Sequence, residues 1–227
     1  MAIPDSIIFS IHLTEPKGIT FGEVRTIKDD DTKLLYLKRR LEDYLLNQID
    51  PISNREKVQT PFSLTVLTCV AVETLGRVVQ PVLLLKRDDK KKNEISKVVS
   101  VHIYSMLDKK LSRQLSQNFK KSMKALWPKE DISKISSYAE IFHNYLRTSF
   151  MHGYRAKNVF LSAELQEGWS FEDGFLVINP YWFWESYKRV FQEQFLLISD
   201  KKEKNNPIRR NALDYFHSLL HDDETGL

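Results

Sequence analysis

The chain has 227 residues, of which 42% are hydrophobic, so it can bury one sizeable core or at most two small ones. Its 34 lysines and arginines against 30 acidic residues leave a net charge of +4, too small a bias to indicate a nucleic-acid partner without local clustering. A single cysteine, Cys69, excludes a disulfide framework and a thiolate metal site. The chain starts without a signal-peptide pattern, and no uncharged apolar stretch is long enough to span a bilayer, so we expect a soluble cytoplasmic protein without membrane contact.

Glycine and proline are scarce, and apolar residues recur mostly at steps of three and four, which favours helices packed on helices. The predicted fold class is all-α, an up-and-down helical bundle with a small β-hairpin inserted before the last long helix. We expect residues 1–200 to form one domain with its core at about 60–198. Residues 201–227 are expected to form a charged linker and a short C-terminal helix.

The first half of the chain predicts a short strand and two helices. Residues 7–13 alternate weakly between apolar and polar, as a strand would. Apolar residues from Leu34 onward mark an amphipathic helix that Asp50-Pro51 is expected to end. Residues 62–83 are apolar around almost the whole helix circumference, which predicts a buried central helix, and a mixed-charge loop is expected over 86–97.

Residues 99–127 predict one long amphipathic helix that ends at Trp127-Pro128. Its apolar side chains fall in one arc of the helical wheel, and four basic residues fall in an arc of roughly 60° on the far side. These are Lys109, Arg113, Lys120 and Lys124. Such a stripe is suited to tracking an RNA backbone, although most stripes of this kind are simply solvated helix faces.

The second half predicts another helix, a hairpin and two final helices. The apolar stripe from Ile135 to Ser149 marks a helix that Gly153 is expected to terminate in the left-handed conformation. Residues 159–178 predict a β-hairpin, because two apolar runs flank Gly168 and Asp173-Gly174. A long helix is expected over 181–198, and a short amphipathic helix follows the polar linker at 201–206.

The stretch that points most directly to chemistry is Arg147-Thr148-Ser149-Phe150-Met151-His152-Gly153-Tyr154. A metal-free ribonuclease needs a group that moves a proton, and histidine suits this role because its pKa lies near neutrality. It also needs a fixed cation on the phosphate, and an arginine guanidinium can hold two phosphate oxygens. The 2′-hydroxyl of RNA would then be the internal nucleophile.

The spacing of Arg147 and His152 limits how the two side chains can form one site. On an ideal helix Arg147 and His152 project about 140° apart, so one straight face cannot hold both. Arg147 points away from the predicted core together with Phe150 and Met151, which is typical of a second packing surface. A homodimer would bury that surface and bring two copies of the motif into one cleft.

A simpler interpretation of the pair stays open. Arg147 can be an ordinary solvated residue, and His152 can interact with the negative end of the helix dipole. A second arginine and histidine, Arg210 and His217, have six residues between them near the C-terminus, which shows how easily such spacings arise.

The order of the elements resembles the HEPN superfamily. The resemblance covers about residues 60–198 and rests on the buried helix with Cys69-Val70-Ala71-Val72-Glu73-Thr74-Leu75-Gly76-Arg77, the long helix after it, and the helix ending in the Arg147 to His152 motif. It implies a dimeric helical bundle and a metal-independent endoribonuclease of bacterial stress, toxin–antitoxin, phage-defence or CRISPR systems, with no cofactor. Arg147 and His152 would be the catalytic pair. The alternatives are a catalytically inactive HEPN-like module that binds RNA, a nucleotide or a protein partner, and a structural helical protein with no ligand.

Further residues have roles by this resemblance. Thr148 stands where active members often carry asparagine. His152-Gly153-Tyr154 resembles the motif of toxins paired with small nucleotidyltransferases, which makes Tyr154 a candidate for adenylylation and an antitoxin or nucleotidyltransferase a possible partner, although a structural tyrosine is the simpler interpretation. Glu73 would orient the motif, or form a structural ion pair with Arg77 four residues later. His143, one turn before Arg147, is expected to share its surface.

Two other groups of residues are less informative. The aromatic run from Tyr181 to Trp184 suits base stacking, but it more often means core packing, and we expect Phe183 and Trp184 to be structural. The histidines have no spacing with carboxylates that would form a metal site.

Overall fold

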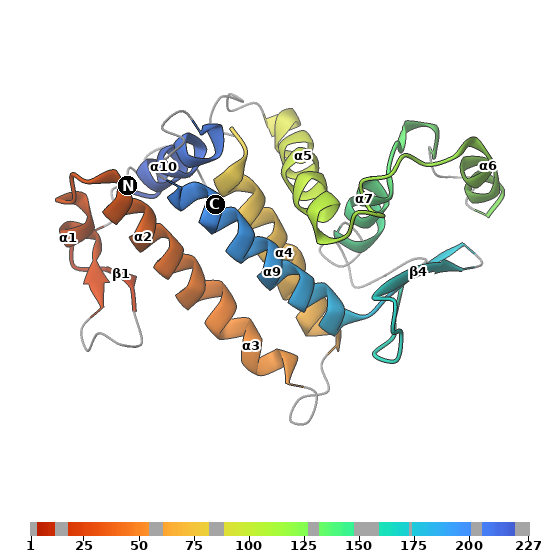
Figure 1. Cartoon of the computed structure of the whole chain (residues 1–227), viewed down its shortest axis with the longest axis horizontal. Helices are drawn as coiled ribbons and strands as arrows, with labels where there is room; N and C mark the ends of the chain where they lie inside the picture. The colour runs from red at the N-terminus through yellow and green to blue at the C-terminus, as the bar shows by residue number, and fades with distance from the viewer. Residues whose placement is uncertain are drawn as a thin grey trace. The chain divides into compact units, whose positions relative to one another are not determined.

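The computed structural model in Figure 1 describes residues 4–11, 18–54, 61–81, 89–126, 132–147, 159–172, 174–200 and 206–220, and these are predominantly helical. The chain divides into two compact units. Unit 1 comprises Met1–Pro51, Arg77–Lys86 and Phe191–Leu227, and unit 2 comprises Ile52–Gly76 and Arg87–Val190. The predicted helical class is confirmed. The predicted division at residue 200 stays a prediction, and the two units cut across it.

Unit 1 combines a small antiparallel sheet with helices from both ends of the chain. Its elements are β1 (Ile8–Ser10), β2 (Ile19–Thr20), α1 (Phe21–Arg25), α2 (Asp30–Leu41), the π-helix η1 (Glu42–Leu46), α3 (Asn47–Ser53), which continues two residues beyond it, and α10 (Pro207–Leu220). The fully buried Phe9 packs edge-on against Phe21 and Phe216, with ring centroids 5.1 and 5.8 Å away. The strand predicted at 7–13 and the C-terminal helix are therefore present, and both contribute to one core.

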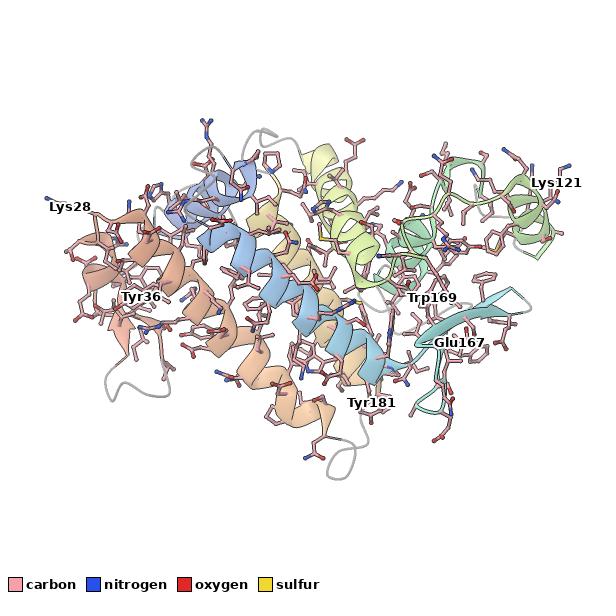
Figure 2. The ribbon with its side chains drawn as sticks, in the orientation of Figure 1. Lys28, Tyr36, Lys121, Glu167, Trp169 and Tyr181 are labelled. Atoms are coloured by element: carbon pink, nitrogen blue, oxygen red, sulfur yellow. The ribbon has the colours of Figure 1, made fainter. Side chains whose placement is uncertain are left out.

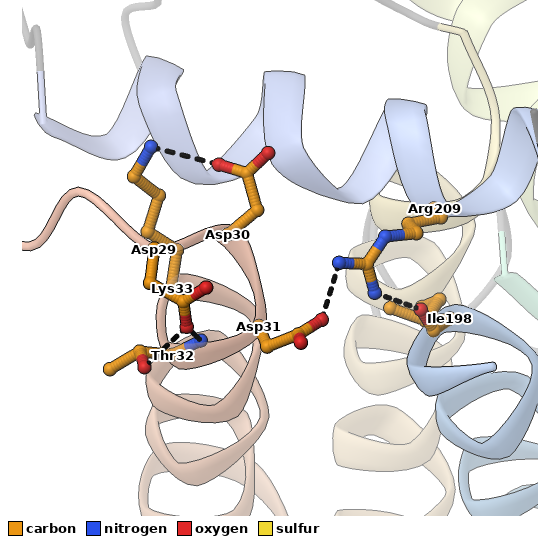
Figure 3. Close-up of polar contacts among 7 residues, drawn as sticks. All are labelled: Asp29, Asp30, Asp31, Thr32, Lys33, Ile198 and Arg209. Atoms are coloured by element: carbon orange, nitrogen blue, oxygen red, sulfur yellow. Dashed lines mark hydrogen bonds and ion pairs between the residues drawn. The ribbon is translucent and has the colours of Figure 1, made fainter. Parts of the chain in front are cut away.

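Arginines fasten the elements of unit 1 to one another. Figure 3 shows the guanidinium of Arg209, on α10, donating to the carboxylate of Asp31 at 2.6 Å and to the carbonyl oxygen of Ile198 at 3.0 Å. In the same view Asp29 caps α2 by accepting a hydrogen bond from the amide of Thr32. Arg40 lies against the rings of Phe9 and Tyr44, at 4.7 and 4.8 Å from their centroids.

The expected helix end at Asp50-Pro51 is wrong, because Pro51 lies inside α3 and the helix continues to Ser53. Proline removes one N–H donor, but it does not prevent the two residues after it from keeping helical dihedral angles.

Unit 2 holds most of the predicted bundle. Its elements are most of α4 (Pro61–Val79), α5 (Asp89–Leu107), α6 (Gln117–Leu126), the 3-10 turn η3 (Ile132–Lys134), α7 (Tyr138–Ile141), the π-helix η4 (Phe142–Arg147), β3 (Val159–Leu161), β4 (Trp169–Glu172), β5 (Phe175–Ile178) and the first half of α9 (Pro180–Ser199). The predicted central helix and the predicted last long helix are thus confirmed as α4 and α9.

Helix α4 is long and apolar enough to cross a membrane by length and composition, with a mean hydropathy of 1.6. More than half of it, 56% of the apolar window, is buried inside the protein, and the central helix of a soluble protein shows the same pattern. Its Thr65 and Thr68 hydroxyls donate to the carbonyl oxygens one turn earlier, which satisfies these polar groups in the core.

The single helix predicted over 99–127 is wrong. Helix α5 begins at Asp89, inside the expected loop, and ends at Leu107, and α6 begins only at Gln117. Between them, the Asp108 carboxylate accepts a hydrogen bond from the amide of Lys110 at 2.8 Å, which forms a turn. Ser116 then caps α6 by accepting from the amide of Phe119 at 3.1 Å. Both polar residues compete with a continuous helix, although the apolar periodicity runs through them.

The β region is a three-stranded sheet in the order β3-β5-β4, so the prediction of a two-stranded hairpin is only partly right. The hairpin joins β4 to β5 through Gly174, which has a φ of 85°, whereas β3 pairs parallel with β5. The strand Trp169–Glu172 is the partner of β5 that the apolar runs did not reveal, because it is short and bounded by Gly168 and Asp173.

Gly76 permits a close approach between α4 and α5. A β-carbon at this position would lie 2.5 Å from the carbonyl oxygen of Val99, a distance that no real side chain tolerates. We expect Gly76→Ala to lower the free energy of unfolding by about 1–3 kcal/mol, because the helices must separate to admit the methyl group. Chemical denaturation followed by circular dichroism measures this, with the exposed Ser63→Ala on the same helix as control. Equal stability of both variants would contradict the close approach.

Candidate functional site

The helix that leads to the Arg147 motif begins with a side-chain N-cap. The side chain of Ser137 caps α7 by accepting from the amide of Glu140 at 3.3 Å. Glu140 also accepts from Ser136 and forms an ion pair with Lys97 of α5 at 2.8 Å. Burial alone would raise the pKa of Glu140, but these hydrogen bonds and the Lys97 charge outweigh it and lower the pKa. The start of α7 is therefore tied to α5 by a charged contact.

Helix α7 passes directly into the π-helix η4, which ends at Arg147. Phe142 and Leu146 are fully buried, and His143 and Tyr145 are each only 6% exposed. Short π-helical stretches occur frequently at functional sites. The angle of about 140° between Arg147 and His152 assumes 3.6 residues per turn over residues 148–152, which lie outside the described residues, so it stays a prediction.

An aromatic cluster fixes α7 and η4 against the small sheet. We define it as Trp169 of β4, Tyr138 and Phe142 of α7 and η4, Phe119 of α6, and Phe171 of β4. Trp169 lies 5.4 Å from Tyr138 and 5.5 Å from Phe142, the latter at a right angle, and Phe119 lies 5.2 Å from both Tyr138 and Phe171. Figure 2 shows Trp169 at the start of β4, near α7.

Trp169 has a polar anchor as well. Its indole Nε1 donates to the Asp108 carboxylate at 3.1 Å, so the residue that ends α5 also orients the cluster. The end of α5 is held from another side by Arg189 of α9, which donates to the carbonyl oxygen of Leu107 at 2.6 Å.

The four basic residues of the predicted stripe do not share one helix face. Lys109 and Arg113 lie in the turns between α5 and α6, whereas Lys120 and Lys124 lie on α6. The broken helix explains this correction. The structure adds two lysines that the helical wheel left out, Lys110 and Lys121, and the doublets Lys109-Lys110 and Lys120-Lys121 were visible in the sequence. Figure 2 shows Lys121 on the outer side of α6.

Most of the predicted motif lies outside the described residues. Thr148, His152 and Tyr154 fall there, and for Arg147 the structure describes the backbone only. His143 is described, and its burial leaves little of it for a solvent-facing surface. The catalytic pair and the possible modification of Tyr154 thus stay predictions.

Four other residues that the sequence analysis considered lie in described parts of the chain. Glu73 is partly buried on α4 and, like Arg77, makes polar contacts, while its role as an orienting carboxylate stays a prediction. Arg77 lies close enough to Tyr215 to act on its pKa, which burial raises and the Arg77 charge lowers. Phe183 and Trp184 are fully buried, which confirms their structural role.

Among the residues that the structure describes, no group of three or more histidine, cysteine, aspartate or glutamate side chains could hold a metal ion. Cys69 is buried and accepts a hydrogen bond from the Tyr104 hydroxyl, with 3.7 Å between oxygen and sulfur.

Comparison of the chain with protein-family models, with curated proteins and with solved structures finds no match. The chemistry of the site therefore rests on its own residues.

We expect His102 on α5 to make the free energy of unfolding depend on pH. Burial lowers the pKa of its imidazole from the ordinary value of 6.5, because the charged form is poorly solvated there. The unfolded chain binds this proton first as the pH falls, so the free energy of unfolding should decrease between about pH 6.5 and the lower folded pKa. We expect His102→Gln to show a smaller loss of stability than wild type between pH 7.5 and pH 5.5 in urea denaturation. An identical loss in both proteins would assign the effect to other groups.

Proposed function

We propose that this protein is a HEPN-type, metal-independent endoribonuclease that acts as a cytoplasmic homodimer in bacterial stress, toxin–antitoxin or phage defence. The observation that carries the proposal is that the Arg147 to His152 motif starts at the last residue of the buried segment formed by α7 and η4, which an aromatic cluster and an ion pair hold in place. A catalytic pair needs such support, because positional errors of an ångström reduce the rate strongly.

The proposed reaction uses the two side chains in different roles. His152 takes the proton from a ribose 2′-hydroxyl, whose oxygen attacks the adjacent phosphorus and expels the 5′-oxygen of the next nucleotide. Arg147 stabilises the negative charge that builds on the phosphate oxygens. The proton that His152 has taken is then given to the leaving 5′-oxygen, so the products are a 2′,3′-cyclic phosphate and a 5′-hydroxyl end, and the imidazole is neutral again.

The other site residues support this pair in the proposal. Glu73 and His143 orient the helices around it, and Thr148 is a polar neighbour of the phosphate. Tyr154 would be the target through which a partner nucleotidyltransferase silences the enzyme, because adenylylation adds bulk and negative charge beside Arg147.

One observation favours the inactive alternative. Thr148 has no carboxamide, the group that often follows the arginine in active members of the resembled superfamily. A module that binds RNA, a nucleotide or a protein partner through the same cleft would tolerate this difference.

The test is cleavage of single-stranded RNA in the presence of a chelator. We expect Arg147→Ala and His152→Ala each to reduce the cleavage rate at least about 100-fold, the loss typical for a general acid/base or an anion-stabilising group. The chain offers its own control pair, Arg210→Ala and His217→Ala, which removes the same chemistry from exposed positions on α10. Light scattering checks that all variants keep the oligomeric state of the wild type.

Cleavage that persists in both motif variants would contradict the proposed site. Binding of RNA without any cleavage by the wild type would favour the inactive module.

A further inference from the structure

One segment of unit 2 carries a strong excess of positive charge. The basic segment, residues 108–124, contains Lys109, Lys110, Arg113, Lys120, Lys121 and Lys124, and its single acidic residue is Asp108. Six basic residues against one acidic residue give it a net charge of +5, which exceeds the +4 of the whole chain. The chain outside this segment is therefore close to neutral, so the modest overall charge conceals a strong local one.

These six cations are available for a partner. Five are exposed, and Lys120 is half-buried. None of the six forms an ion pair within the described part of the chain, in contrast to Lys97, which Glu140 neutralises. The one carboxylate of the segment, on Asp108, is engaged by the indole of Trp169 and the amide of Lys110.

The basic segment is fixed to the helix that leads to the proposed catalytic motif. The amide of Ala139 donates to the carbonyl oxygen of Leu111 at 2.9 Å, and the amide of Leu115 donates to that of Ser136, also at 2.9 Å. The side chain of Phe119 then packs on Tyr138, at 5.2 Å between ring centroids. In Figure 1 the chain runs from the end of α5 past α7 to α6. The backbone that carries Lys109, Lys110 and Arg113 is therefore bonded to α7 and the residues before it, and Phe119 fastens the first turn of α6 to the same helix.

The packed apolar face of α6 argues against an anionic membrane surface as the partner of the basic segment. Met123 is 1% exposed, and Phe119 packs on Tyr138 and Phe171, so these apolar side chains are covered by the unit's own elements. A helix that binds anionic lipid surfaces instead inserts its apolar face into the membrane. A soluble polyanion that contacts only the outer, basic face suits α6 better.

We propose that the basic segment binds the phosphate backbone of single-stranded RNA and leads the strand along α7 toward Arg147. The choice of RNA among polyanions rests on the proposed function. The contacts are to phosphates only, so binding is independent of base sequence and decreases steeply with salt, because the release of counterions gains less free energy at higher salt concentration.

The experiment measures binding without cleavage. Its probe is a fluorescent single-stranded 2′-O-methyl RNA, which lacks the nucleophilic hydroxyl, and fluorescence anisotropy gives the dissociation constant at several potassium chloride concentrations. The test variant is Lys121→Gln with Lys124→Gln, two exposed lysines one turn apart on α6. The matched control is Lys28→Gln with Arg210→Gln, two exposed cations of unit 1.

We expect the test variant to bind at least about fivefold more weakly, and the slope of log affinity against log salt to fall by about 1.4, since each phosphate contact on a single strand contributes about 0.7. The control should stay within about twofold of the wild type. Equal weakening of both variants would overturn the proposal, because net charge alone would then explain binding.

Two further arms separate the remaining explanations. Binding of phosphatidylserine vesicles through the same lysines, without RNA binding, would overturn the proposal in favour of a membrane surface. If the wild type cleaves RNA but the test variant binds and cleaves it normally, the nuclease proposal stands and the basic segment has no part in it. If the wild type binds through these lysines but cleaves nothing, the basic segment stands and the nuclease proposal falls.

Discussion

The packing of Trp169 is the interaction on which the candidate site depends. The indole ring packs against the rings of Tyr138 and Phe142, and its nitrogen donates to the Asp108 carboxylate. Its strand, β4, pairs with β5 in the small sheet. Three segments far apart in sequence therefore meet at one side chain: the end of α5, the α7–η4 helix and the small sheet. Helices α7 and η4 together span Tyr138–Arg147, a helical segment too short to be stable by its own hydrogen bonds, so its direction depends on packing such as this contact.

The position of the basic segment follows from the same contacts of Asp108 and Trp169. Because Asp108 both ends α5 and binds Trp169, the residues that follow it turn away from the helix axis and run beside α7. This turn separates Lys109 and Arg113 from Lys120 and Lys124, yet backbone hydrogen bonds and Phe119 keep all of them fastened to the helix that ends at Arg147. The same contacts therefore position both the basic segment and the candidate catalytic helix.

Much of the fold was predictable from apolar periodicity, since the helical class, the buried α4, the long α9 and the short α10 all follow from it. The errors occurred where a polar side chain ends an element without interrupting the apolar pattern. Asp108 and Ser116 divide a helix whose apolar arc continues through the break, because Leu111 and Leu115 stay buried in the turn. Trp169 escaped detection because a four-residue strand has too few alternations to show a period. The chemistry of the motif was predictable as residue types, whereas its support by Trp169 and Asp108 depends on contacts over 61 residues of separation.

The central claim is that Trp169 holds both the motif-bearing helix and α6 in place, and hydrogen–deuterium exchange in Trp169→Ala tests it most directly. Loss of a buried tryptophan costs about 3–5 kcal/mol, so we expect amides of Tyr138–Ile141 and Gln117–Leu126 to exchange at least about tenfold faster, while α10 keeps its protection. Phe160→Ala, an exposed aromatic residue of the same sheet, serves as the control and should leave both segments unchanged. Unaltered exchange of α6 and α7 in Trp169→Ala would contradict the account.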